Sequence, residues 1–174
     1  MKWSVQQLQA LRHKGLQVDE SVDMSQIMQV DREIRGVTPV LVRGKALFSK
    51  ESVTFLLQIS GSMTLPCART LNDVEHPFTI QATEIFPLDE WATFEEDDED
   101  VHDLDGQTVN LLPYIQERIL LEKPLRVFSD KKAGPAPEEG PGWQLNLNVE
   151  EDEESDDTQV DPRLKKLEQF FDKK

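Results

Sequence analysis

The segment from Val53 to Leu65, VTFLLQISGSMTL, alternates apolar and polar side chains almost without interruption. Because successive side chains of a β-strand point to opposite faces of a sheet, this pattern predicts a strand with one buried face. Leu56 is the exception on the polar side, and Gly61 is a candidate β-bulge. The side chains expected on the buried face are Val53, Phe55, Leu57, Ile59, Met63 and Leu65.

Two neighbouring segments predict further strands. Residues 37–48 alternate in the same way, and Pro39 favours a strand start or an edge position. Residues 77–86 alternate up to Ala82, after which the pattern slips by one at Ile85 and indicates a second candidate bulge. Because the links between the segments are short, we expect an antiparallel β-meander or a partial barrel with one buried face.

A helical pattern occurs on both sides of these strands. Ser4 and Gln7 have the spacing of a capping box ahead of an apolar stripe, which predicts an N-terminal helix. Residues 16–26 are interpreted as a polar connection from this helix to the first strand. Residues 110–124 predict a central helix that Pro124 ends. The expected fold class is therefore α+β, with the sheet packed against the N-terminal and central helices.

Acidic residues are concentrated in two runs. The chain has 174 residues and a formal net charge of -15, from 34 acids against 19 bases. Residues 95–105 hold eight acids and residues 150–157 hold seven, with no Lys or Arg in either run, and these fifteen account for the whole excess. We expect a solvated acidic loop and an acidic tail on a nearly neutral body. The alternative is that the runs hold a basic partner or exclude nucleic acid.

Composition divides the chain into three parts. Residues 1–128 form the α+β core domain in this interpretation, with the first acidic run inserted as a loop. Residues 129–160 form a Gly/Pro-rich and acidic flexible segment that includes a short strand at residues 143–149. Residues 161–174 form a C-terminal helix, because the Asp-Pro pair that opens them is a strong helix start.

The chain has one cysteine, Cys67, in a polar turn between two predicted strands. It has no partner for a disulfide, and its spacing from His76 does not match a zinc site. Catalysis by the thiol would require a base such as His76, so packing at the end of a strand is the favoured interpretation. The sequence also lacks a P-loop and a dinucleotide-binding fingerprint. We expect no metal, no cofactor and no enzymatic activity.

The sequence shows neither a long apolar stretch nor the pattern of a signal peptide, so we expect a soluble cytoplasmic protein. Positive charge is concentrated in the first 69 residues, which hold nine Lys or Arg against six acids. A basic sheet face can bind phosphates, whereas a solvated strand face is the alternative interpretation. The cluster consists of Arg32, Arg35, Arg43, Lys45 and Lys50.

Four segments, taken in order, resemble a known family. They are LPCARTL, VNLLPYIQERILLEKP, WQLNLNV and DPRLKKLEQFF. In this order and spacing they are similar to the YceD family, whose members are described as large ribosomal RNA subunit accumulation proteins. The N-terminal MKWSVQQLQ is similar to the Bacillus-type branch of that family. The resemblance implies a non-enzymatic role in making or stabilising the large ribosomal subunit, with its rRNA or a pre-ribosomal particle as the partner.

This sequence departs from the family pattern at its cysteines. The family often has a second cysteine where this chain has Thr70, and the later cysteine-rich knuckle has no cysteine here. If those cysteines bind metal in relatives, this protein has lost the site. A function that survives the loss is then independent of metal chemistry.

The candidate binding residues are the five basic residues above together with Cys67, Arg69, Asp161 and Arg163. An alternative function is an acidic escort, or chaperone, for a small basic ribosomal protein, in which the two acidic runs mask the partner's charge. Arg69 can bridge strands, or meet a phosphate or a carboxylate. A solvent-facing, unpaired Arg69 would favour partner binding, and a buried, paired one would favour an architectural role.

Overall fold

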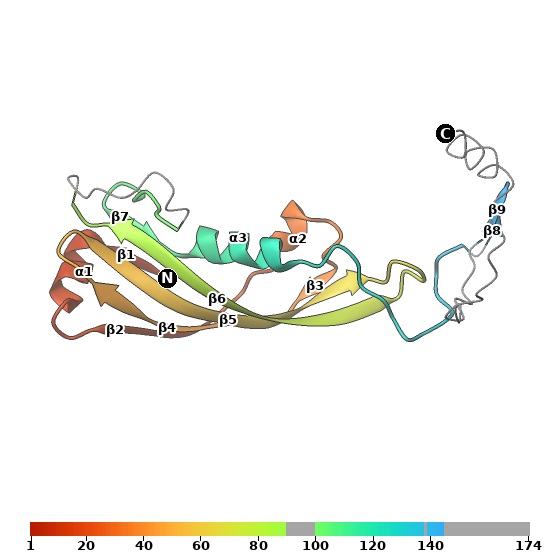
Figure 1. Cartoon of the computed structure of the whole chain (residues 1–174), viewed down its shortest axis with the longest axis horizontal. Helices are drawn as coiled ribbons and strands as arrows, with labels where there is room; N and C mark the ends of the chain where they lie inside the picture. Colours follow the sequence, from red (N-terminus) through yellow and green to blue (C-terminus); the bar gives the residue numbers. More distant parts are fainter. Residues whose placement is uncertain (90–99, 138, 145–174) are drawn as a thin grey trace, which may run out of the picture. The chain divides into compact units, whose positions relative to one another are not determined.

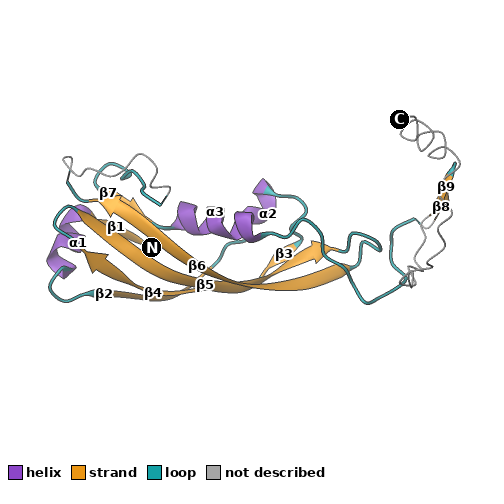
Figure 2. Cartoon of the chain, in the orientation of Figure 1, coloured by secondary structure: helices purple, strands orange, loops and turns teal. Residues whose placement is uncertain are grey.

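The structure, a computed structural model, describes residues 1–89, 100–137 and 139–144. The chain divides into two compact units, Met1–Ala136 and Pro137–Lys174. Most of the regular secondary structure of the first unit is β-strand (Figure 2). In chain order the elements are β1 (Lys2–Ser4), α1 (Val5–Leu11), β2 (Leu16–Val22), α2 (Ile27–Val30), β3 (Gly36–Val37), β4 (Val40–Phe48), β5 (Ser52–Pro66), β6 (Asp73–Pro87), β7 (Thr108–Asn110), α3 (Leu112–Glu122), β8 (Glu139–Gly140) and β9 (Trp143–Gln144).

The main sheet of the first unit is antiparallel and is built around β5. β2, β4 and β5 are neighbours in this order, and β6 pairs with the other edge of β5. The short strand β3 pairs antiparallel with β5 near its C-terminal end, opposite Met63 and Thr64. The expected meander is therefore present in β4, β5 and β6. Among the described strands, β2 and β6 are the two edges of an open sheet, so these strands do not close into a barrel (Figure 1).

The edge strand β2 corrects the interpretation of residues 16–26 as a polar connection. β2 pairs with β4 over seven residues, from Leu16 opposite Ala46 to Val22 opposite Val40. Most of the polar side chains of β2 are exposed to water because an edge strand has little to pack against. Val18 is the one residue of β2 that is buried. The apolar alternation that identifies the central strands is therefore missing from β2.

β5 and β6 pair through all 15 residues of each strand without a break in register. The predicted bulges at Gly61 and Ile85 are therefore wrong. Gly61 stays in register opposite Phe78, where an added Cβ would lie 2.9 Å from the phenyl ring. Glycine is required here because the ring fills the space that a side chain would occupy.

The slip in the apolar pattern near Ile85 is explained by a buried acid at an inward position. Glu84 is 1% exposed and accepts a hydrogen bond from Arg118 Nε at 2.8 Å. His102 Nε2 lies within hydrogen-bonding distance of the other carboxylate oxygen, and Arg118 also pairs with Asp100. A carboxylate is tolerated inside the fold because these partners replace the water that it loses.

The core forms where the inward face of the sheet meets α1 and α3. All six side chains that the alternation of residues 53–65 assigns to the buried face are buried. The capping box of Ser4 and Gln7 is present at the start of α1, as predicted. Leu8 of α1 and Ile115 and Ile119 of α3 are fully buried against the sheet. The structure is therefore mixed α and antiparallel β, in agreement with the expected α+β class.

β1 and β7 form a separate two-stranded sheet that joins the N-terminus to the segment before α3. The described part of the second unit is the β8–β9 hairpin, which overlaps the start of the strand predicted at residues 143–149. The rest of that strand, the acidic run 150–157 and the helix predicted at residues 161–174 lie outside the described residues. Of the first acidic run, residues 100–105 are described, and Val101 forms a parallel bridge with Ile85.

Candidate nucleic-acid interface

The β5–β6 hairpin ends in the turn that contains Cys67. The Cys67 amide donates a hydrogen bond to the Asn72 carbonyl at 2.7 Å, and the Leu71 amide donates to the Cys67 carbonyl at 3.0 Å. Leu71 has a φ of 59°, a left-handed conformation that is uncommon for a residue with a side chain. These hydrogen bonds close the turn over residues 67–72 and fix the backbone that carries the Arg69 side chain.

Residues 123–136, which we call the strap, run along this turn and are tied to it by hydrogen bonds. The bonds join Ala68 N to Val127 O at 2.9 Å, Asn72 Nδ2 to Ala133 O at 2.7 Å, and Ala136 N to Thr70 O at 3.2 Å. Because the contacts are spread along the strap, its side chains are held beside the turn. The end of the hairpin is therefore built from two segments that are distant in sequence.

The thiol of Cys67 lies between the turn and the strap and is 1% exposed. Its Sγ accepts N–H bonds from Arg69 at 3.4 Å, from Thr70 at 3.5 Å and from Ser129 at 3.3 Å. Burial by itself raises the pKa of the thiol, but the hydrogen bonds from Thr70, Arg69 and Ser129 outweigh burial and lower the pKa from 9.0 to about 6. Cys67 is thus an internal acceptor that joins the two segments.

Arg69 points away from this junction and is exposed. Its guanidinium carbon lies 4.7 Å from the centroid of the Phe128 ring, in the geometry of a cation–π contact. Phe128 is itself 52% exposed. Among the described carboxylates, none forms an ion pair with Arg69. By the criterion set out above, the exposed and unpaired Arg69 favours partner binding over an architectural role.

Exposed basic and apolar side chains surround this contact. The turn (residues 67–72) and the strap together carry five bases and one acid, a net of +4 in a chain with a net charge of -15. Leu125 is fully exposed, at 101%. Within the described part of the chain, the three basic residues of the strap that follow Pro124 have no ion-pair partner. We define the hairpin-end surface as Arg69, Leu71, Leu125, Arg126, Phe128, Lys131 and Lys132.

Two cations, Lys123 and Arg35, hold the hairpin-end surface to the rest of the sheet through three ion pairs. Lys123 Nζ, at the start of the strap, lies 2.6 Å from both Asp31 Oδ2 and Glu33 Oε2. Hydrogen bonding to Asp31 and Glu33 raises the pKa of Lys123, and the bond from Lys123 lowers the pKa of Asp31. Arg35 donates to the Leu71 carbonyl at 2.9 Å and pairs with Asp73 at the base of the turn.

The structure brings some of the predicted binding residues together and separates others. Cys67, Arg69 and Arg35 meet at the end of the hairpin, and Arg32 is exposed between Asp31 and Glu33, which bind the strap. Arg43 and Lys45 lie on the solvent face of β4, where Arg43 pairs with Asp19, and Lys50 lies in the β4–β5 turn at the opposite end of β5. Asp161 and Arg163 lie outside the described residues.

Sequence reasoning missed the strap. Arg126, Phe128, Lys131 and Lys132 fall within ten residues of one another, and that density of bases beside an aromatic side chain was the available signal. Counting bases over the first 69 residues drew attention to β4 instead. The contact between the strap and the turn is a tertiary feature, and local patterns do not show it.

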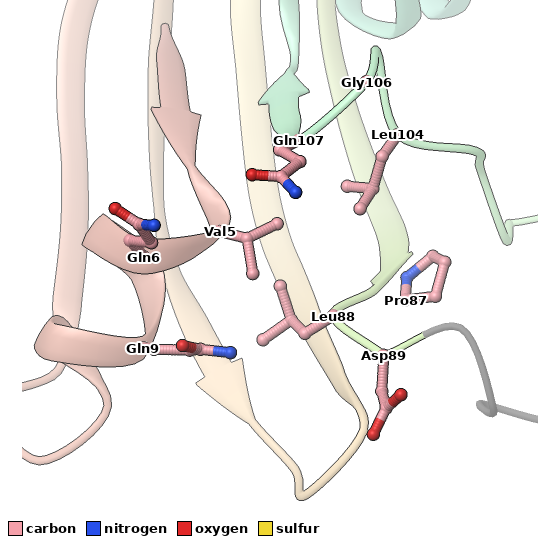
Figure 3. Close-up of a pocket in the computed structure, with 9 residues that line it drawn as sticks. All are labelled: Val5, Gln6, Gln9, Pro87, Leu88, Asp89, Leu104, Gly106 and Gln107. Carbon is pink, nitrogen blue, oxygen red and sulfur yellow. The ribbon is translucent and has the colours of Figure 1, made fainter.

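Other cavities in the first unit have different chemistry. One of about 450 Å³ lies between α1 and the end of β6, where Val5, Leu88 and Leu104 face one another beside glutamine side chains (Figure 3). No Lys or Arg lines it, so it offers nothing to phosphates. A second, of about 210 Å³, is lined partly by Glu84 and Glu117. Within the described residues, no group of three or more His, Cys, Asp or Glu side chains is placed to hold a metal ion.

Comparison with known proteins identifies the family. The family profile described as "Large ribosomal RNA subunit accumulation protein YceD" matches residues 55–171. The chain belongs to the YceD family. It is also 39% identical over 173 residues to the Bacillus subtilis (strain 168) protein YlbN, described as uncharacterized, covering 98% of this chain and 96% of that protein. No solved structure matches.

The matched region includes β5, β6, the turn and the strap, so the whole hairpin-end surface lies within the part of the chain that defines YceD membership. Thr70, at the position of the family's second cysteine, is buried, and its backbone N–H bonds to Cys67 Sγ. None of the helices in the described residues has the length and apolar character needed to cross a membrane.

Proposed function

We propose that this YceD protein supports the accumulation of large-subunit rRNA by binding that RNA, or a pre-ribosomal particle that contains it, through the hairpin-end surface. The observation that carries the proposal is the exposed Arg69–Phe128 contact among cations without ion-pair partners in the described residues. The protein acts in this proposal by binding alone, without a reaction of its own.

The chemistry of the hairpin-end surface suits RNA. Lys and Arg side chains that neutralise phosphates release condensed counterions, which supplies much of the affinity for a nucleic acid. Exposed aromatic rings and guanidinium planes add stacking contacts with bases. A surface that combines the two is unusual on a chain with 34 acids, and it lies where the family profile matches.

Sedimentation of cell extracts tests the proposal. A tagged chain should co-sediment with large-subunit precursors in a sucrose gradient at low salt and move to the top of the gradient as salt is raised. Replacing Arg126, Lys131 and Lys132 by alanine should release it at lower salt. The matched control replaces Lys2 and Lys14, which are exposed and lie outside the hairpin-end surface. A chain that stays at the top of the gradient even at low salt contradicts the proposal.

A pulldown with and without nuclease separates RNA binding from the escort function. Recovery of rRNA that nuclease abolishes supports the proposal. The escort function predicts a different result. One small basic protein would still be recovered after nuclease treatment, and its recovery would be lost when residues 95–105 and 150–157 are deleted. That result would replace the RNA-binding proposal with the acidic escort.

A further inference from the structure

We infer that the hairpin-end surface takes an unpaired, unstacked nucleotide of single-stranded RNA, with the base stacked on the Arg69–Phe128 pair and the flanking phosphates on the cations of the strap. This inference rests on the proposed function and specifies the form of RNA that the site accepts.

The first argument is the geometry of the stack. The guanidinium carbon of Arg69 lies over the Phe128 ring, 4.7 Å from its centroid, and both side chains are exposed, so this planar pair remains accessible to a base. A base of a duplex already stacks on its neighbours on both sides and has no face left for such a pair. A base in a loop, a bulge or a strand end does, and bases of that kind stack on aromatic and guanidinium planes.

The second argument is that the Arg69–Phe128 pair is held in place before RNA arrives. Arg69 leaves a turn closed by backbone hydrogen bonds, and the backbone next to Phe128 is fixed by Ala68 N to Val127 O at 2.9 Å and by Ser129 N to Cys67 Sγ at 3.3 Å. Less ordering of the protein is then needed on binding, which favours affinity. A solvated arginine on a free loop would lack this advantage.

The third argument is the small extent of the cationic surface. Arg126, Lys131 and Lys132 all lie within the strap. Arg126 also lines a cavity of about 190 Å³, together with Cys67 and Leu125. Domains that recognise duplex RNA by its shape reach across two successive minor grooves, over about 16 base pairs. Lys50 lies at the other end of β5, roughly 50 Å away for a 15-residue strand at about 3.3 Å per residue. The basic residues therefore match one short single-stranded segment.

Fluorescence anisotropy with two labelled RNAs tests the inference. The probes are an unstructured single strand of about 12 nucleotides, a size that fits ordinary single-strand sites, and a blunt duplex of about 20 base pairs, which is longer than the roughly 16 base pairs that a duplex-binding domain spans. The full chain should bind the single strand at least roughly tenfold more tightly than the duplex. Equal or tighter binding of the duplex overturns the inference.

Conservative variants identify the stacking contribution. Arg69→Lys keeps the charge and loses the planar group, and Phe128→Leu keeps an apolar side chain and loses the ring. Each should weaken single-strand binding by roughly tenfold while leaving the salt dependence unchanged. Lys131→Ala with Lys132→Ala should instead reduce the salt slope by about 1. Unaltered single-strand affinity in both stacking variants, with unchanged urea midpoints, contradicts the inference.

The same data distinguish the two levels of the proposal. If both RNAs bind with similar affinity and both lose affinity when Lys131 and Lys132 are replaced, RNA binding stands and the preference for unstacked bases is wrong. If neither RNA binds more tightly to the wild type than to the variant Arg126→Ala, Lys131→Ala, Lys132→Ala, both proposals are overturned.

Discussion

Cys67 and Arg69 are two residues apart and have opposite roles in the turn. Cys67 is turned inward, where its Sγ accepts three backbone N–H groups from the turn and the strap. Arg69 is turned outward, over a half-exposed ring. A substitution at Cys67 should therefore change stability, whereas a conservative substitution at Arg69 should change binding.

The lowered pKa of Cys67 predicts the direction in which the stability of the protein changes with pH. Because the pKa in the folded chain is about 6, below its ordinary value of 9.0, the folded state favours the thiolate. The stability that this adds is fully present above pH 9 and is lost as pH falls to about 6. The free energy of unfolding of the wild type, relative to Cys67→Ser, should rise with pH across this window by at most about 1.4 kcal/mol per pH unit.

Urea unfolding at several pH values, with a reductant present, measures this difference. Other titrating groups cancel because the two proteins share them. A difference between wild type and Cys67→Ser that stays constant from pH 6 to pH 9 would contradict the thiolate interpretation.

At the scale of elements, the cluster around Glu84 joins three separate parts of the fold. Glu84 lies on β6, Arg118 lies on α3, and Asp100 and His102 lie in the described part of the first acidic run. The ring of His102 also stacks on Tyr114 of α3, with centroids 3.8 Å apart. Burial raises the pKa of Tyr114, and the carboxylates of Asp103 and Glu84 raise it further. The helix and the segment after residue 99 are therefore fixed to the sheet by polar contacts.

Arg118→Ala should destabilise the first unit by about 3 kcal/mol, because it leaves the buried Glu84 without its main charged partner. Replacing both residues with leucine should recover most of that loss, since the buried charge is then removed together with its partner. Urea unfolding of the three proteins gives the comparison. A double variant no more stable than Arg118→Ala would show that the cluster contributes in some way other than by neutralising Glu84.

How much of each element could be predicted depended on burial. β5 was predicted nearly in full because both of its edges are paired and one of its faces is buried, so its sequence alternates. β2 was missed because a solvated edge strand needs few apolar side chains. The change of pattern near Ile85 was misinterpreted as a bulge. Glu84 points inward, so a carboxylate breaks the alternation of apolar and polar side chains while β5 and β6 remain paired in register.

The candidate site could also be predicted only in part from the sequence. Arg69 could be selected from the sequence because it lies in a short turn between two predicted strands. Phe128 could not, since its role depends on the strap lying against that turn, 59 residues away in sequence. Long-range contacts of this kind are set by tertiary hydrogen bonds such as Ala68 N to Val127 O, and local periodicity carries no record of them.

For the whole molecule, the central feature is the contrast between net and local charge. A chain with a net charge of -15 repels RNA on average, while the turn and the strap carry a net of +4. Such a contrast favours one orientation of approach, with the hairpin end toward the RNA. Raising salt screens both the repulsion and the attraction, so the local contacts determine how affinity depends on salt.

The most direct test of this account is the salt dependence of binding between the purified chain and large-subunit rRNA. Wild type should bind with an affinity that falls steeply as salt rises. The variant Arg126→Ala, Lys131→Ala, Lys132→Ala should lower the slope of log affinity against log salt by about 2, while Lys2→Ala with Lys14→Ala leaves it unchanged. A triple variant with the same affinity and the same slope as wild type would contradict the claim that the hairpin-end surface binds rRNA.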